Sequence, residues 1–229
     1  MYSPYSHSRI TCFSTCKKKF KYKYIDKIEM EINSDALKKG SLVHNFLEKK
    51  FKDNVEELPK ADSAPLQNDV EKIITKKLPQ NFLYNKLLKE CEIIGAEVDV
   101  ALTKDFKPTT NDKAYFRGSI DILAKHKQTG KYIILDWKTG KSKDKIPELD
   151  QVGLYAIYVL KKYKIEECVG FYNYIEHNLH LKQNYNKDKI KELEKLYTAA
   201  LNQIHAEKEF KGKMTGLCNY CEYKGLCFG

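Results

Sequence analysis

The chain has 229 residues, of which 42% are hydrophobic, enough for one large domain or two small ones. Its net charge of +10 favours a polyanionic partner. Only Arg9 and Arg117 are arginines among the 41 basic residues, and because such a lysine excess is typical of A/T-rich coding, the charge by itself is weak evidence for nucleic acid binding. No stretch has the apolar length of a signal core or a membrane span, so we expect a soluble intracellular protein and exclude a membrane-spanning one.

The first ninety residues show mainly helical patterns. A serine-capped helix is predicted from Ser6 or Ser8 to about residue 24. Apolar residues at helical spacing predict a second helix over about residues 35–52. The segment 53–90 contains three prolines and predicts a polar loop followed by helical turns.

The middle of the chain has the pattern of strands. Residues 92–102 alternate well enough for one strand. Two apolar runs, 116–124 and 131–137, are separated by the polar segment 127–130, which ends in Gly. This arrangement predicts an antiparallel hairpin.

Helix and strand patterns continue after the hairpin. We predict a helix over about 148–162, a strand near 169–175 and a long amphipathic helix over about 187–208. The final segment, 212–229, predicts a compact coil that carries cysteines. We therefore expect one domain over residues 1–229, with an α/β or α+β fold in which helices flank a mixed β-sheet.

The predicted hairpin concentrates three charged side chains. Side chains repeat every second residue along a strand, so Asp136 and Lys138 share one face while Trp137 points into the core. The register places Asp121 opposite either Asp136 or Lys138. Carboxylates can hold a hard divalent cation, and an ammonium group can stabilise developing negative charge, as a phosphodiester hydrolase requires. The alternative, an exposed Asp–Lys pair, conflicts with the apolar sequence around it, where unpaired charge is costly.

Three further side chains are candidates for the same site. His44 projects from the apolar face of its predicted helix and can serve as a third metal ligand, although such a histidine is more often a core residue. Gln151 and Tyr155 lie four residues apart on the helix after the hairpin and would face a substrate groove. An amphipathic helix with a buried tyrosine explains this pair equally well.

The seven cysteines do not suggest a disulfide framework, because the number is odd and intracellular thiols stay reduced. Cys218, Cys221 and Cys227 lie in a segment with few apolar residues, which indicates a metal-binding loop. Cys16 can supply a fourth thiolate, and Cys12, one helical turn earlier, can take its place. Four thiolates suit either a [4Fe–4S] cluster or Zn²⁺, and residue chemistry alone does not separate the two.

The order of these motifs resembles a known nuclease family. Ser-x-Ser and Cys are followed by a helical His, Gly-x-x-Asp, Asp-x-Lys, Gln-x-x-x-Tyr and three C-terminal Cys, from Ser6 to Cys227. This order resembles the RecB-like branch of the PD-(D/E)XK nucleases, above all the iron–sulfur exonucleases associated with CRISPR adaptation and their phage-borne relatives. Two positions depart from the family pattern: Lys17 follows Cys16 where Pro is usual, and Asp136 stands where many relatives carry Glu.

The resemblance implies a restriction-endonuclease-like core with a catalytic centre in which Lys138, Asp121 and Asp136 are catalytic. Mg²⁺ or Mn²⁺ would be held by four groups: His44, Asp121, Asp136 and the backbone carbonyl of Trp137. Glu97 matches an acidic position sometimes present on the preceding strand.

The resemblance also implies a substrate-binding pair and a cluster. Gln151 and Tyr155 would bind substrate. A [4Fe–4S] cluster would be held by four cysteines: Cys16, Cys218, Cys221 and Cys227. These lie in two elements, 6–24 and 212–229, which would pack together.

The resulting prediction is a cytoplasmic, metal-dependent DNA exonuclease that acts on single-stranded ends in CRISPR adaptation, recombination or phage DNA processing, in the host cytoplasm if phage-encoded. Proteins of CRISPR adaptation or recombination would be its partners. One alternative is a DNA-binding adaptor of a spacer-capture or recombination complex that does not cleave. The Asp–Asp–Lys set argues against this adaptor, because holding like charges together is costly. Another is a zinc-stapled nuclease that processes RNA.

Overall fold

A computed structural model describes residues 4–30 and 34–228 of the chain. Its strands form one five-stranded sheet in the order β1-β2-β3-β4-β5, with β3 and β4 parallel and the other neighbours antiparallel. The strands are β1 (Cys91–Leu102), β2 (Phe116–His126), β3 (Tyr132–Lys138), β4 (Glu167–Tyr174) and β5 (Leu179–Asn186). The predicted mixed sheet is therefore confirmed, and its one parallel pair requires a crossover, which contains helix α6.

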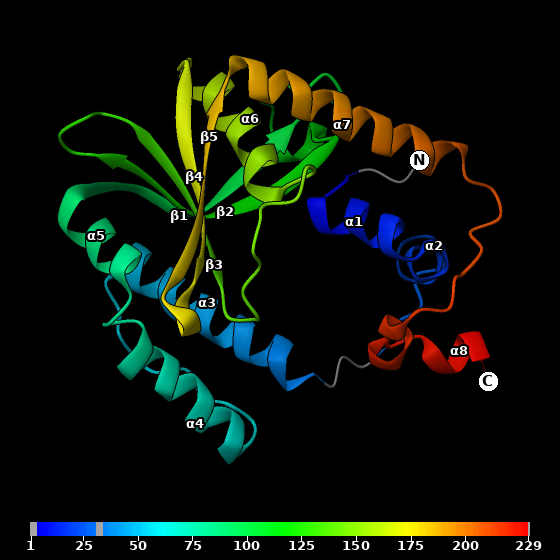
Figure 1. The fold of residues 1–229 in the computed structure, drawn as a ribbon, viewed down its shortest axis with the longest axis horizontal. Coiled ribbons are helices and arrows are strands. Elements are labelled where there is room, and N and C mark those ends of the chain that lie inside the picture. Colours follow the sequence, from blue (N-terminus) through cyan, green and yellow to red (C-terminus); the bar gives the residue numbers. More distant parts are fainter. Residues whose placement is uncertain (1–3, 31–33, 229) are drawn as a thin grey trace.

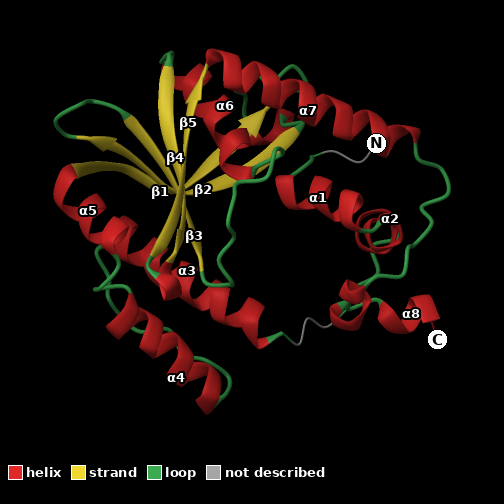
Figure 2. Ribbon diagram, in the orientation of Figure 1, coloured by secondary structure: helices red, strands yellow, loops and turns green. Residues whose placement is uncertain are grey.

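Helices cover both faces of the sheet (Figures 1 and 2). Helices α6 and α7 lie on one face with α1 packed against them, while α3 and α5 lie on the other with α4 packed on α3. The longer helices are α1 (His7–Thr15), α3 (Asp35–Asp53), α4 (Ala64–Lys72), α5 (Phe82–Glu90), α6 (Gln151–Tyr163) and α7 (Lys187–Ala206). Two short ones are α2 (Lys17–Phe20) and α8 (Lys224–Phe228). Among the described residues, no helix is long and apolar enough to cross a membrane.

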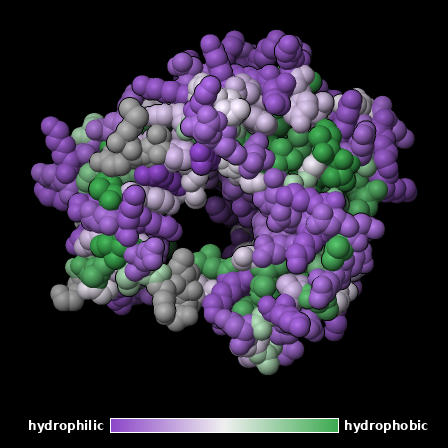
Figure 3. Space-filling view, turned by 180° about the vertical axis from the view of Figure 1, so that it is seen from behind, coloured by the Kyte–Doolittle hydropathy of each residue, from purple (hydrophilic) through white to green (hydrophobic). Residues whose placement is uncertain are grey.

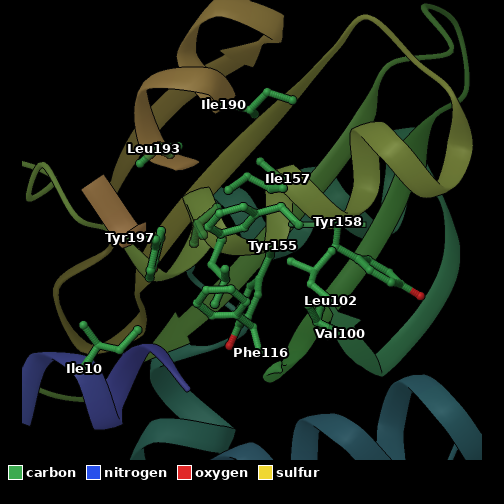
Figure 4. Close-up of a cluster of buried hydrophobic side chains, with 14 of the residues drawn as sticks. Ile10, Val100, Leu102, Phe116, Tyr155, Ile157, Tyr158, Ile190, Leu193 and Tyr197 are labelled. Carbon is green, nitrogen blue, oxygen red and sulfur yellow. The ribbon is translucent and has the colours of Figure 1, made fainter. Parts of the chain in front are cut away.

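The two sheet faces bury separate apolar clusters. The cluster under α6 and α7 contains Val100, Phe116 and Tyr155 from the sheet and α6, and it extends to Ile10 of α1 (Figure 4). The cluster under α3 and α5 contains Leu135 and Trp137 of β3. Leu135 and Trp137 thus point away from α6, as the period-two pattern predicts, which leaves Asp136 and Lys138 on the α6 side.

Three local features differ from the sequence-based expectations. The strand β5 was not predicted, although the alternating Leu179, Leu181 and Tyr185 are its sequence signature. Helix α6 begins at Gln151, three residues later than expected, because the side chain of Asp150 caps it by accepting from Gly153 N–H. The N-terminal helix is interrupted at Cys16, which adopts an extended conformation and caps α2.

Replacing Gly170 with alanine is expected to lower the free energy of unfolding by about 1–3 kcal/mol, the usual cost of overpacking. Gly170 lies on β4 under α6, and a Cβ atom there would lie 2.6 Å from a ring carbon of Tyr185 and even closer to Val152. Urea denaturation monitored by circular dichroism measures the change. Gly140→Ala is the control, since a Cβ atom there meets no atom within 4 Å. Equal stability of the two variants would contradict the described packing of α6 on β4.

Candidate metal and catalytic site

The Asp121 carboxylate lies where β2 and β3 separate. Regular pairing of the two strands includes Ile122 with Leu135, and the same register continued by one residue sets Asp121 opposite Asp136. Beyond the paired region the backbone N–H of Trp137 donates to Asp121 Oδ2 at 2.7 Å, in place of a strand-to-strand hydrogen bond. This contact ties the Asp121 carboxylate to the end of β3, the strand that carries Asp136 and Lys138.

The buried Asp136 and the partly exposed Lys138 form an ion pair beside Asp121. Lys138 Nζ lies 2.6 Å from Asp136 Oδ2, and the Asp136 side chain is 2% exposed. The ammonium does not approach along a hydrogen-bonding direction, so this oxygen is left without a hydrogen-bond donor. Burial and the neighbouring charge of Asp121 together raise the pKa of Asp136 to about 6, against the opposing charge of Lys138. Burial opposes the charge of Lys138, but the two carboxylates outweigh it and raise the lysine pKa.

His44 reaches the same region from α3. Its Nε2 lies 3.0 Å from the backbone carbonyl oxygen of Trp137, and its Nδ1 lies 3.5 Å from Asp121 Oδ2. Burial disfavours the imidazolium, but the contact with Asp121 outweighs burial and raises the pKa of His44. A core role for His44, the alternative interpretation, does not fit a side chain that is 30% exposed and hydrogen-bonded to Trp137 near the end of β3.

Glu97 completes a group of three ligand atoms. One ligand atom each from His44, Glu97 and Asp121 lies within 4.8 Å of the other two, and these three residues are the one such group in the described residues. The register of β1 and β2 explains why these residues converge. Ala96 and Val98, the neighbours of Glu97, pair with Ile122 and Ile120, the neighbours of Asp121. Asp136 stands outside the group because its carboxylate faces Lys138.

The backbone at Glu97 is strained in a way that sequence analysis missed. Its φ of 48° lies in the left-handed region, three residues after the pairing of β1 shifts between Ile93 and Gly95. Ser119 donates a hydrogen bond of 2.6 Å to Glu97 Oε2 and orients the carboxylate. A glycine inside a strand is a sign of such a bulge, and bulges are frequent next to functional sites, so Gly95 was the available indication.

Gln151 and Tyr155 are adjacent to this site but differ in exposure. Lys138 Nζ lies 3.3 Å from Gln151 Oε1, and the Gln151 amide donates to the Tyr155 hydroxyl at 2.7 Å. Tyr155 is only 4% exposed, and burial raises its pKa, so it stays protonated. The expectation that both side chains face a groove is therefore wrong for Tyr155, whose ring packs so closely on β2 that a Cβ atom on Gly118 would lie 2.6 Å from it. Tyr155 supports Gln151, which is the residue that reaches solvent.

The four predicted cluster cysteines line one cavity of about 110 Å³: Cys16, Cys218, Cys221 and Cys227. Cys12 does not line it; burial raises the pKa of Cys12 to about 11, and its side chain packs against the apolar cluster under α6. No three of the cysteines bring their sulfur atoms within 4.8 Å of one another in the described chain.

The chain ends pack together around the cysteine cavity. Lys19 donates to Glu222 at 2.7 Å, the Tyr22 hydroxyl donates to the carbonyl of Leu226 at 3.2 Å, and Tyr223 donates to the carbonyl of Ile28 at 3.0 Å. Figure 1 shows this C-terminal segment, in red, below α2. The predicted packing of segment 212–229 on the N-terminal elements is present.

The fold and this site together define a class of protein: a nuclease with a restriction-endonuclease-like core, in which carboxylates and a lysine meet at the end of two neighbouring strands. The family comparison agrees, since a model described as the PD-(D/E)XK nuclease superfamily matches residues 4–228, and the chain belongs to that superfamily. A solved structure titled "Crystal structure of SSO0001" is similar, with 14% identity and a TM-score of 0.41 over 98% of this chain and 85% of that one. No curated protein sequence matches.

Proposed function

We propose that this chain is a Mg²⁺- or Mn²⁺-dependent exonuclease that hydrolyses phosphodiester bonds at single-stranded DNA ends. The observation that carries the proposal is the meeting of His44, Glu97 and Asp121 beside the Asp136–Lys138 pair. Membership of the superfamily supports metal-dependent cleavage of DNA. The preference for single strands and the requirement for a free DNA end are our proposals and do not follow from membership of the superfamily.

The residues present fit a hard divalent cation. Carboxylate oxygens with one imidazole are suitable donors, and the buried Asp136 Oδ2 makes an ion pair with Lys138 but no directed hydrogen bond. His44, Glu97, Asp121, Asp136 and the Trp137 carbonyl would hold the ion. When bound, it would supply an acidified water and Lewis-acid stabilisation of the phosphoryl oxygens.

The protein groups around the ion have separate tasks. Lys138, charged and paired with Asp136, would stabilise negative charge that develops on the phosphoryl oxygens and orient the attacking water. Gln151 holds the ammonium at 3.3 Å, and the buried Tyr155 hydroxyl holds Gln151, so α6 sets the position of Lys138. Because Asp150 caps the helix at this point, the N-terminal end of α6 cannot shift without losing a buried hydrogen bond.

The surface around the site supports a nucleic acid substrate, which we propose is single-stranded. The molecule is hollowed at its centre in the space-filling view (Figure 3). A cavity of about 850 Å³ lies between α3 and the end of β3, and His44, Trp137, Lys138 and Lys141 are among its lining residues. A basic groove of this kind tracks a nucleic acid backbone without reading sequence. We therefore assign the unpaired strand to this groove.

A [4Fe–4S] cluster in the cysteine cavity belongs to the same proposal, with Cys16 as the first ligand. Four thiolates around a tetrahedral Zn²⁺ at about 2.3 Å would lie about 3.8 Å from one another. No three of the sulfur atoms lie within 4.8 Å of one another, so the described cysteines do not form a closed zinc site, and we assign the cluster from the order of the cysteine motifs. The cluster would be structural and join the two chain ends.

A digestion series tests the proposed activity. Labelled single-stranded, double-stranded and circular DNA are incubated with Mg²⁺, Mn²⁺ or no added metal, and products are resolved on a gel. We expect metal-dependent shortening of linear single strands, slower loss of duplex and no loss of circles. Binding without degradation under every metal would contradict the nuclease proposal and favour the adaptor. Cleavage of circles would contradict the need for a free end.

The wider context of the proposal follows from its substrate. We assign the chain to one nuclease domain over residues 1–229 that works in the cytoplasm, or in the host cytoplasm if phage-encoded, on DNA intermediates of CRISPR adaptation, recombination or phage DNA processing. RNA carried through the same digestion series separates a DNA-specific enzyme from an RNA-processing one.

A further inference from the structure

A second, smaller cavity lies against Lys138, next to the groove of the proposed active site. It has a volume of about 230 Å³ and is bordered by His7 of α1, by residues 140, 141, 143 and 145–147 after β3, by Gln151, and by Tyr172 and Tyr174 of β4. Lys138, Gly140 and Lys141 border both this cavity and the larger groove. The two spaces therefore meet at the residues where the scissile phosphate would lie.

The cavity is strongly cationic. Lys141, Lys143 and Lys145 line it together with Lys138, and no carboxylate residue is among the lining residues. Within the described ranges, none of the first three lysines has a carboxylate partner, whereas many other lysines of this chain are ion-paired. A group of unpaired ammonium groups around one small space favours a phosphate ligand.

Part of the cavity lining is apolar. Ile146, Pro147 and Leu181 line the cavity beside the aromatic rings of Tyr172 and Tyr174. An inorganic anion gains nothing from contact with apolar side chains. The sugar and base of a nucleotide can pack on them, because every base offers an apolar face to an aromatic side chain.

His7 contributes a hydrogen-bond acceptor to the same cavity. The Tyr197 hydroxyl donates to the carbonyl of Asp150 at 2.9 Å, so it must accept from His7 Nδ1, which lies 2.8 Å away. His7 Nε2 then carries a lone pair and has no partner among the described residues. Burial, with Lys138 and Lys143, lowers the pKa of His7 to about 4 and keeps the ring neutral. A neutral acceptor suits a ligand hydroxyl, which a nucleotide carries in addition to its phosphate.

The size of the cavity limits what it can hold. Pockets for drug-sized ligands measure roughly 300–1,000 Å³, so 230 Å³ suits one nucleotide and excludes a run of them. His7 lines the cavity and is hydrogen-bonded to Tyr197, which is fully buried. A strand that enters from the groove would therefore end here.

We propose that this cavity is a binding site for a single deoxynucleoside monophosphate, the unit at the end of a DNA strand and the product of its removal. Lys143 and Lys145 hold the phosphate, and the wall of Ile146, Tyr174 and Leu181 holds the sugar and base. The inference rests on the proposed nuclease function for its biological meaning, but the binding site itself can be tested without catalysis.

Isothermal titration of the full-length holoprotein without added divalent cation tests the site. Thymidine monophosphate is expected to bind at least tenfold more tightly than thymidine or inorganic phosphate alone. The double variant Lys143→Gln/Lys145→Gln should weaken the nucleotide by about tenfold or more, because each charge-assisted contact contributes strongly to binding. The matched control is Lys72→Gln/Lys76→Gln, two exposed lysines of the α4 region that line no described cavity, and it should change binding less than twofold.

The outcomes separate the cavity from the nuclease function. Absence of nucleotide binding, binding unaffected by the Lys143/Lys145 variant, or phosphate binding as tight as the nucleotide would overturn the proposal. DNA degradation is measured on the same preparations. Degradation without nucleotide binding overturns the cavity assignment alone, whereas nucleotide binding without degradation supports the cavity and contradicts the nuclease.

Discussion

Replacing Lys138 with methionine should reduce metal-dependent degradation of single-stranded DNA by about a thousandfold, the upper range for loss of one preorganised charge-stabilising group. Methionine keeps most of the side-chain stem but removes the ammonium that lies 2.6 Å from Asp136. Asp136→Asn should cause a loss of similar size, because it removes a carboxylate needed for the cation while preserving the side-chain shape. The measurement is the initial rate on an end-labelled oligonucleotide at saturating Mg²⁺ or Mn²⁺.

The structure also defines what must be controlled in that experiment. Removing Lys138 leaves Asp136 buried without its cation, a change that costs roughly 3–5 kcal/mol unless the carboxyl group becomes protonated. Urea denaturation should therefore accompany the activity assay. Lys131→Met is the matched control, since Lys131 also forms an ion pair, 2.6 Å from Glu167, but at the opposite end of β3 and with half of its side chain exposed. Full activity in a folded Lys138→Met protein would refute the role assigned to this lysine.

The central hairpin was predictable because its sequence pattern is local. Alternation along residues 131–137 separates Asp136 from Leu135 and Trp137, and a short polar turn defines which strand pairs with which. The same logic placed the helix of His44 and the helix of Gln151 within about three residues of their ends. These patterns describe one sheet and the helices on it, which is why the fold class and the superfamily follow from the sequence.

Features that depend on three-dimensional packing were not predictable in this way. The position of Glu97 results from a shift in strand pairing and a left-handed backbone, neither of which follows from alternation. The burial of Tyr155 depends on the absence of a side chain at Gly118, which lies 37 residues earlier in the chain. The nucleotide-sized cavity joins His7 to a loop beyond residue 138, and only folding brings these segments together.

The C-terminal segment provides the second large prediction, because it has little core of its own. Met214, Leu217 and Tyr220 are 72%, 61% and 89% exposed, whereas Tyr223 is buried. Because apolar burial is of this small extent, we expect the proposed cluster to contribute much of the free energy that orders this segment. We expect anaerobically purified protein to be brown and to lose its colour and much of its thermal stability when the cluster is oxidised.

Cys16→Ser should abolish the cluster, whereas Cys12→Ser should retain it, because only Cys16 lines the cavity with Cys218, Cys221 and Cys227. The pair is a matched test, since both cysteines lie one helical turn apart in the same N-terminal region and differ mainly in which way the thiol points. Iron and sulfide content and visible absorbance measure occupancy, and thermal unfolding measures the stability of the joined ends. Stoichiometric zinc in colourless protein would contradict the cluster, and loss of iron in the Cys12 variant alone would reverse the choice of ligand. Either result would leave the catalytic centre unaffected, because Asp121, Asp136 and Lys138 lie on the sheet and make no described contact with these cysteines.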